Sequence, residues 1–232
     1  ACTIHFRSQK AVRIVSTGIQ TAPPGKTGRE ADSRAGHQIG PNSLMRTLQA
    51  VEESYGPAMA GELHRRAALP SNRWDTLIPE EWFLSLIREL RSLLPSAEAD
   101  AMLRRAGALT GEYVQENRIP MIFRRLLAAL PPRLAVPLLL QAFRRHAWTF
   151  AGSGRFRFEG RHPSTLVLEG SPTCRLPGGT DRSGSYYEAA FETLLSLAAP
   201  GIRVREVSCQ AAGDPACRFE LLLPSPPLSR RP

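Results

Sequence analysis

The chain has 232 residues, a formal net charge of +9 at pH 7 and a hydrophobic content of 42%. These values fit one large domain, or a domain with tails, that can bury a real core. The longest apolar run, residues 134–143, is interrupted by Pro137 and Gln141 and is too short to span a bilayer. The sequence has no zinc finger, RNP signature or basic zipper, so we expect no nucleic-acid partner.

The two ends of the chain differ in composition from its middle. Residues 1–38 mix Gly, Pro, Ser, Thr and charged residues without sustained periodicity, which predicts a mobile tail. Residues 224–232 are rich in Pro, Ser and Arg and predict a second tail. The folded domain is therefore expected at 39–223. No charged segment followed by an apolar one opens the chain, so we expect a cytoplasmic protein.

The first half of the domain predicts helices. Asn42 is expected to cap the first of them, and Gly56-Pro57 to end it and begin the next. Further helices are expected from Pro79 onward and at 96–117, 121–130 and 133–148.

The second half changes to the alternating pattern of strands. Strands are expected at 155–159, 165–169, 202–209 and 217–223, with a helix at 186–199 between the second and third. This order is β-β-α-β-β. We therefore predict an α+β fold in which the N-terminal helices pack on a four-stranded antiparallel sheet.

The most specific chemical feature is a set of cysteines and a glutamate near the C-terminus. Glu206, Cys209 and Cys217 surround a turn-rich hairpin loop, and Cys174 precedes them. Thiolate and carboxylate are zinc ligands in tetrahedral sites. The spacing alone leaves open three other readings: buried structural cysteines, a hairpin disulfide, or reactive thiols. In a regular strand Glu206 and Cys209 would point to opposite faces, so a shared metal requires a twist, a bulge or a strand end between them.

These residues carry a family resemblance. The stretch from Glu206 to Phe219, with Cys209, Gly213 and Cys217 at its spacing, resembles the C-terminal signature of the 4-vinyl-reductase domain family. That resemblance implies a structural zinc bound by Cys174, Glu206, Cys209 and Cys217, as in the sensor members of the family. The loop after Cys174 is longer than in those sensors.

Two further stretches point to one branch of that family. Asn117-Arg-Ile-Pro120 and residues 146–154 resemble the bacteriochlorophyll 4-vinyl reductase proteins of purple photosynthetic bacteria. The resemblance covers residues from about 40 to 223. It implies the fold of TRAPP subunits and haem-based nitric oxide sensors, and a Mg-tetrapyrrole as ligand. Bacteriochlorophyll biosynthetic enzymes are the implied partners in photosynthesis.

Several residues are candidates for the pigment site. His64 and His146 are candidate axial ligands, Arg144 and Arg145 candidate anchors for a carboxylate, and Trp148 a candidate wall. Gly107 and Gly111 in the fourth helix would allow a ring to approach closely, although tight helix packing explains such glycines as well. A core or surface role is equally open for the histidines.

The sequence does not favour an enzyme. Neither of the glycine runs at 152–154 and 178–179 is a dinucleotide-binding motif, and a four-ligand zinc site has no open position for catalysis. We therefore expect a carrier or accessory protein that binds a Mg-tetrapyrrole. The alternatives are the vinyl reductase of divinyl protochlorophyllide itself and a small-ligand sensor domain. Peripheral membrane association and a homodimer stay open.

Overall fold

The computed structural model describes residues 37–71, 74, 76–160, 165–175 and 184–224, all within the compact unit His37–Pro232. The predicted tail at 1–38 falls almost wholly outside the described residues, so its boundary stays a prediction. The helices are α1 (Asn42–Arg66), α2 (Glu80–Leu93), α3 (Ser96–Asn117), α4 (Met121–Ala129), α5 (Pro132–His146), α6 (Trp148–Ala151) and α7 (Ser185–Leu195). The strands are β1 (Gln38–Ile39), β2 (Ile78–Pro79), β3 (Arg155–Glu159), β4 (Thr165–Glu169), β5 (Arg203–Ser208) and β6 (Cys217–Leu222).

The main sheet has the strand order β3-β4-β6-β5, and every neighbouring pair is antiparallel. Helix α7 connects β4 to β5, so the predicted β-β-α-β-β order and the α+β class are confirmed. The bounds of β3 and β4 agree with the predicted strands. In β3 apolar and polar residues alternate, whereas β4 is a short buried apolar run, residues 166–168, between Thr165 and Glu169. A small β1–β2 pair, Gln38 opposite Pro79 and Ile39 opposite Ile78, was not predicted. It is too short to leave a periodic signal.

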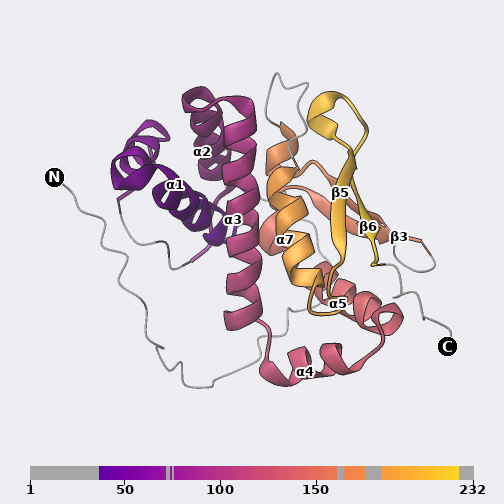
Figure 1. The fold of residues 1–232 in the computed structure, drawn as a ribbon. Helices are drawn as coiled ribbons and strands as arrows, with labels where there is room; N and C mark the ends of the chain where they lie inside the picture. Colours follow the sequence, from indigo (N-terminus) through magenta and orange to yellow (C-terminus); the bar gives the residue numbers. More distant parts are fainter. Residues whose placement is uncertain (1–36, 72–73, 75, 161–164, 176–183, 225–232) are drawn as a thin grey trace, which may run out of the picture. The chain divides into compact units, whose positions relative to one another are not determined.

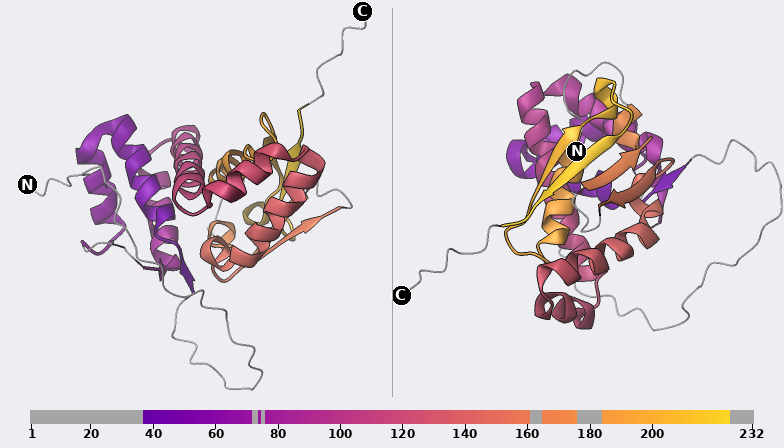
Figure 2. Two further views of the ribbon diagram at one scale, coloured as in Figure 1. Left: turned by 90° about the horizontal axis from the view of Figure 1, so that it is seen from below. Right: turned by 90° about the vertical axis from the view of Figure 1, so that its right-hand side faces the viewer.

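The helices form layers against the sheet. Helix α7 packs on β5, α3 packs along α7, and α1 packs on α3 and α2, as Figures 1 and 2 show. Helices α5 and α6 contact β3. Phe191 of α7 lies at the centre of an aromatic cluster in the core. Its ring contacts those of Phe143, Phe150, Phe156, Tyr187 and Phe219.

Some helix ends differ from the predicted ones. Gly56 has a non-helical conformation, with φ 82° and ψ 171°, so α1 is kinked where Gly56-Pro57 predicted a break. Asn42 does not cap α1: Pro41 precedes the helix and no side chain caps it. Helix α7 ends at Leu195, and short turns continue to Ile202 in place of a helix reaching 199. The predicted helix was too long because the apolar residues continue past Leu195 into the turns, where Ala198 and Ala199 are also buried.

Helices α3 and α7 approach each other closely at two glycines of α3. A Cβ added at Gly107 would lie 2.1 Å from the backbone oxygen of Tyr186, and one at Gly111 would lie 2.6 Å from the Cβ of Thr193. The two glycines therefore serve the close approach of these helices. They face α7 and not a ligand-sized space.

No helix in the described ranges is both long and apolar enough to cross a membrane.

The α3–α7 contact makes a stability prediction. Gly107→Ala should lower the free energy of unfolding by about 2 kcal/mol or more, because the new methyl group meets backbone that cannot rotate away. Gly61→Ala is the matched control: nothing lies within 4 Å of its added Cβ, so it should stabilise α1 by roughly 0.5–1 kcal/mol. Urea unfolding measures both. Equal, small effects at the two positions would contradict the packing role of Gly107.

Candidate metal centre

Three of the predicted ligands lie together at the β5–β6 hairpin. One donor atom each from Glu206, Cys209 and Cys217 lies within 4.8 Å of the other two. All three residues are buried, with exposed fractions of 1–2%. Cys209 and Cys217 are not disulfide-bonded, so the alternative of a hairpin disulfide is not formed in the structure.

A β-bulge brings Glu206 and Cys209 to the same side. The register between β5 and β6 shifts between Glu206 and Ser208, and Val207 at the bulge is 44% exposed. The bulge adds one residue to the strand and reverses the alternation of its side chains. This meets the condition that the sequence set for a shared metal.

Backbone amides surround the donor atoms. The amide of Gly184 donates to Glu206 Oε2 (3.0 Å), and the amide of Gln210 donates to Cys217 Sγ (3.3 Å). Asp214 accepts from the amide of Cys209 (2.7 Å) and so fixes the hairpin loop. Such N–H donors stabilise the charged forms of carboxylates and thiolates, which are the forms that bind metal.

Gly184 must lack a side chain at this place. An added Cβ would lie 2.5 Å from the carboxylate carbon of Glu206. Gly184 is also the residue immediately before α7, so the Glu206 carboxylate lies at the N-terminus of that helix. The positive end of the helix dipole favours an anion there.

The buried carboxylate of Glu206 is costly to ionise. Burial, together with the neighbouring Cys209 and Glu188, raises the pKa of Glu206 to about 8 against the lowering effect of the Gly184 amide. Glu188 accepts a hydrogen bond from the backbone amide of Glu206 and forms an ion pair with Arg104 of α3. A cation between the three donors would remove this cost.

The donor set fits zinc. Tetrahedral angles and zinc bond lengths place neighbouring ligand atoms about 3.3–3.8 Å apart. Donors within 4.8 Å of one another reach that spacing with small side-chain movements. The combination of thiolates with one carboxylate suits zinc better than magnesium or calcium, which take oxygen ligands.

The backbone of Cys174 lies near the other three ligands. It lies in a short 3₁₀ helix, η1 (Pro172–Arg175), which packs against η2 (Gln210–Ala212) in the hairpin loop. The amide of Gly170, just before η1, donates to the side chain of Gln210 (2.7 Å). The side chain of Cys174 lies outside the described residues, so its role stays a prediction.

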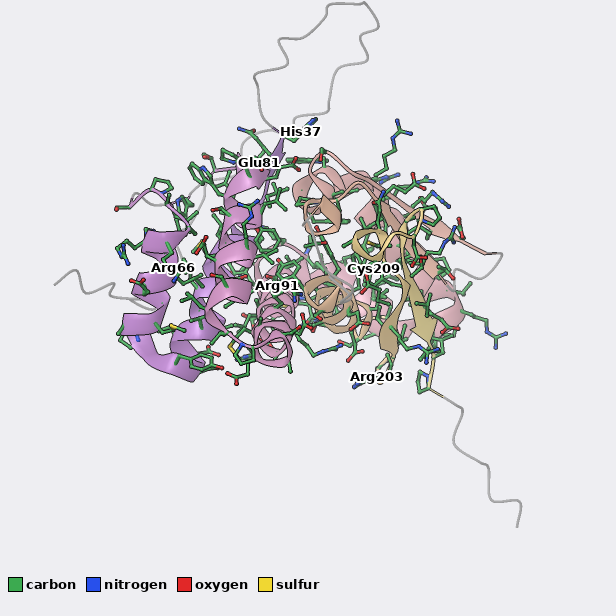
Figure 3. The ribbon with its side chains drawn as sticks, turned by 90° about the horizontal axis from the view of Figure 1, so that it is seen from above. His37, Arg66, Glu81, Arg91, Arg203 and Cys209 are labelled. Atoms are coloured by element: carbon green, nitrogen blue, oxygen red, sulfur yellow. The ribbon has the colours of Figure 1, made fainter. Side chains whose placement is uncertain are left out.

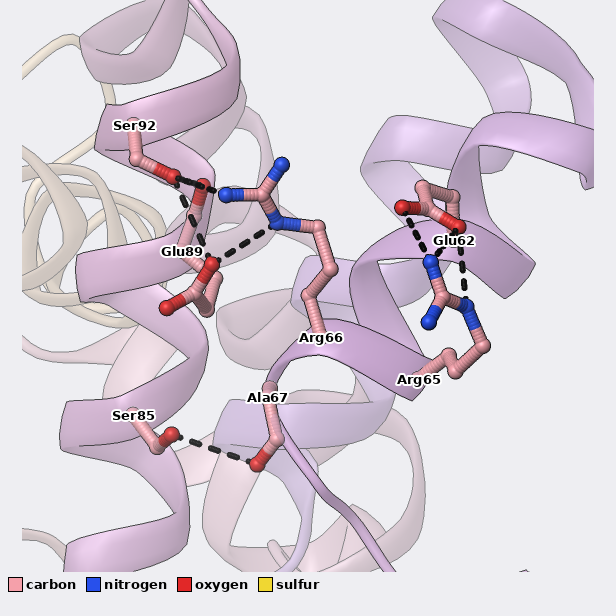
Figure 4. Close-up of polar contacts among 7 residues, drawn as sticks. All are labelled: Glu62, Arg65, Arg66, Ala67, Ser85, Glu89 and Ser92. Carbon is pink, nitrogen blue, oxygen red and sulfur yellow. Dashed lines mark hydrogen bonds and ion pairs between the residues drawn. The ribbon is translucent and has the colours of Figure 1, made fainter.

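The candidate pigment residues fall into separate places. Gly107 and Gly111 contact α7. His64 stacks on Trp74 at the end of α1, with ring centroids 5.9 Å apart. Its neighbour Arg65 pairs with Glu62, and Arg66 pairs with Glu89 and Ser92, as Figure 4 shows. Figure 3 shows Arg66 well separated from Cys209.

The remaining candidates lie together in sequence at the junction of α5 and α6. Arg144, Arg145 and His146 form the last turn of α5, and Trp148 begins α6. All four are exposed, Trp148 by 56%. The Arg144 guanidinium lies over the ring of Phe158, 5.9 Å from its centroid.

Sequence reasoning missed a buried glutamate beside this junction. Glu80, at the start of α2, is 1% exposed and accepts a hydrogen bond from the amide of Ser153 (2.9 Å). Gly152 has a φ of 57°, and an added Cβ there would lie 2.1 Å from Glu80 Oε2. Gly152 and the amide of Ser153 therefore enclose this carboxylate. Glu80-Glu81 at a helix start gave no hint of burial, because acidic residues are common there.

The metal centre predicts one zinc per chain. Cys209→Ser and Cys217→Ser should each lose most of the zinc and destabilise the fold by several kcal/mol, because structural zinc-binding free energy adds to folding free energy. Cys2→Ser, in the predicted tail, is the matched control and should keep both. Elemental analysis and thermal unfolding measure the two effects. A protein without metal, or a Cys209–Cys217 disulfide, would refute the assignment.

The Glu206 carboxyl predicts a pH dependence for the metal-stripped protein. Its folded pKa, about 8, lies above the ordinary value of 4.5, so between these values the folded state holds a proton that the unfolded chain has released. The free energy of unfolding should therefore fall as pH rises from about 5 to 8. Glu206→Gln should flatten this fall, and Glu220→Gln, which removes a half-exposed carboxylate of β6, should not. Urea titrations at several pH values decide the matter, and an unchanged slope in Glu206→Gln counts against it.

Known proteins place the chain in a family. No protein-family model matches it. It is 38% identical over 188 residues to the bacteriochlorophyll synthase 23 kDa chain of Cereibacter sphaeroides, covering 80% of this chain and 91% of that relative. The corresponding chain of Rhodobacter capsulatus is 33% identical over 186 residues, with coverage of 79% and 86%.

Solved structures share the fold at low identity. The Fe(II) unliganded H-NOX protein from K. algicida aligns with a TM-score of 0.55 at 12% identity, covering 81% of this chain and 98% of that one. A Cs H-NOX mutant aligns with a TM-score of 0.53 at 11% identity and the same coverage. These structures show the fold alone and agree with the predicted nitric-oxide-sensor type. The two sequence relatives confirm the resemblance to the purple bacterial branch: the chain belongs to the family of bacteriochlorophyll synthase 23 kDa chains.

Proposed function

We propose that this protein serves bacteriochlorophyll biosynthesis by binding a Mg-tetrapyrrole intermediate and presenting it to biosynthetic enzymes. Membership of a family whose relatives are named bacteriochlorophyll synthase 23 kDa chain is the observation that carries the proposal. We further propose that a structural zinc, held by Cys174, Glu206, Cys209 and Cys217, supports the fold. The geometry of the last three donors supports this part.

The α5–α6 junction is the best candidate for the pigment contact. The exposed imidazole of His146 is accessible to an axial magnesium position. Arg144 and Arg145 precede it and offer planar donors to a pigment carboxylate. Trp148 presents an exposed ring, which can lie against the flat face of a macrocycle.

His64 is less suited to that role. Its ring is already stacked on Trp74, and the arginines beside it are engaged by surface glutamates. Binding a pigment there would require these contacts to be broken first. His64 therefore serves best as a comparison residue.

A carrier suits the proposed site better than a reductase. An exposed contact region allows a bound pigment to be transferred, and a zinc held by four protein ligands serves the fold and not chemistry. Binding that is strong enough to collect the pigment but weak enough to release it corresponds to a dissociation constant of about 1 μM.

Absorption titration with Mg-protoporphyrin tests this proposal. Binding should shift and sharpen the Soret band. His146→Ala should weaken binding by roughly tenfold or more, as should the double substitution Arg144→Gln with Arg145→Gln. His64→Ala is the matched control and should bind as the unmodified protein does. Circular dichroism of each variant checks that the fold is retained.

Two outcomes would contradict the proposal. The first is no spectral change with Mg-protoporphyrin or with protochlorophyllide. The second is reduction of the vinyl group of divinyl protochlorophyllide by the pure protein with NADPH, which would make the protein the reductase itself.

A further inference from the structure

In one stretch of the chain all the charged residues are basic. Between Arg118 and Phe158 the sequence has no Asp or Glu. The same stretch contains the arginines 118, 124, 125, 133, 144, 145, 155 and 157. It includes the whole of α4, α5 and α6. A basic patch of this kind attracts an anionic surface.

Large apolar side chains are exposed on the same helices. Met121, Ile122 and Leu126 of α4 are 57%, 83% and 46% exposed, and Leu127 is the one buried residue of that helix. Leu134 and Leu138 of α5 are 56% and 36% exposed. Being four residues apart, the two leucines lie on one side of α5. We call these five side chains the α4–α5 face.

The α4–α5 face lies at the edge of the folded unit. Helix α4 follows the end of α3 and packs mainly on α5, away from the layers that α1, α2 and α7 form around α3, as Figures 1 and 2 show. Single exposed apolar residues are common on protein surfaces, but five large ones on two neighbouring helices indicate an interaction site. Their exposure is a stability cost unless another surface covers them.

The arginines around this face differ in their pairing from several exposed arginines of other elements, although Arg88 of α2 is also exposed and has no carboxylate partner among the described residues. Arg118, Arg125 and Arg133 are exposed, and within the described residues none of them pairs with a carboxylate. Exposed arginines of other elements do pair: Arg65 with Glu62, Arg66 with Glu89, Arg105 with Glu53 and Arg205 with Glu220. The guanidinium groups beside the α4–α5 face are therefore available to an outside anion.

We propose that the α4–α5 face docks this protein onto the surface of a bilayer that contains anionic lipids. At the boundary between headgroups and acyl chains, phosphate and hydrocarbon lie side by side, and a helix with apolar and basic residues is stabilised there. The apolar side chains of α4 and α5 enter the hydrocarbon edge, while Arg118, Arg125 and Arg133 contact lipid phosphates. Helix α4, with 9 residues, lies on the bilayer and does not cross it.

Flotation with lipid vesicles tests the docking. The full chain should float with vesicles of phosphatidylcholine containing phosphatidylglycerol, and far less with phosphatidylcholine alone. Binding should weaken as salt rises, since exposed charges are screened. The double substitution Ile122→Gln with Leu126→Gln should reduce the bound fraction by roughly tenfold or more, as should Arg118→Gln with Arg125→Gln.

Matched controls come from surfaces outside the face. Leu223→Gln removes an apolar side chain that is 55% exposed after β6, and Arg88→Gln removes an exposed charge from α2. Both should float as the unmodified protein does. Zinc content and circular dichroism check that each variant is folded. The substitutions leave Arg144, Arg145 and His146 intact, so loss of vesicle binding with unchanged pigment titration separates this proposal from the pigment-binding one.

Three results would overturn the inference. Equal flotation with both vesicle types would remove the role of the arginines. Vesicle binding that survives both double substitutions would place the docking elsewhere. A concentration-dependent dimer in the absence of lipid, abolished by Ile122→Gln with Leu126→Gln, would show that a second copy of the chain covers the face.

Discussion

The buried carboxylate of Glu206 beside two buried cysteines is the constraint on which the C-terminal half of the fold depends. The three side chains connect the β5–β6 hairpin to the start of α7, where the Gly184 amide meets the carboxylate. Helix α7 in turn carries the contact with α3, and through it the outer helices. Burying up to three anions is unfavourable unless a proton or a metal ion neutralises them. The structural zinc that we propose would resolve this conflict and would explain why so polar a group lies in the core.

The close packing of α3 on α7 is the second constraint, and it is linked to the first. Gly107 and Gly111 let the helix backbones approach so closely that Arg104 of α3 reaches Glu188 of α7, which holds the backbone of Glu206. Helix packing, ion pair and candidate metal site thus form one connected path. Substitutions at two points along this path are expected to have non-additive effects on the free energy of unfolding, because their side chains share one network of contacts.

Much of this arrangement could be predicted from the sequence. Alternation located β3, and an apolar run between Thr165 and Glu169 located β4. Ser96, followed by Glu98 and Asp100, marked the start of α3. The cysteine–glutamate spacing, with the family resemblance, brought together three residues that the structure places side by side. The sequence indicated that a shared metal requires a twist, a bulge or a strand end between Glu206 and Cys209. It did not predict the bulge at Val207, since no local pattern in the strand reveals it.

Other features depend on tertiary contacts that no local pattern contains. Gly184, Glu188 and Asp214 surround the candidate metal centre, yet each resembles an ordinary loop or helix residue in sequence. The burial of Glu80 was equally hidden. The seven candidate pigment residues share types suited to a tetrapyrrole, but residue type does not determine position. The structure separates His64 from the α5–α6 junction and assigns the two α3 glycines to helix packing.

The central claim is the proposed metal ion at the β5–β6 hairpin. Zinc K-edge X-ray absorption on the purified full chain reports which atoms bind the metal and at what distance. Three sulfur ligands at about 2.3 Å and one oxygen ligand at about 2.0 Å are the predicted first shell. A shell of nitrogen and oxygen alone, or the absence of an absorption edge in protein prepared under reducing conditions, would contradict the claim that Glu206 and the cysteines hold a structural zinc.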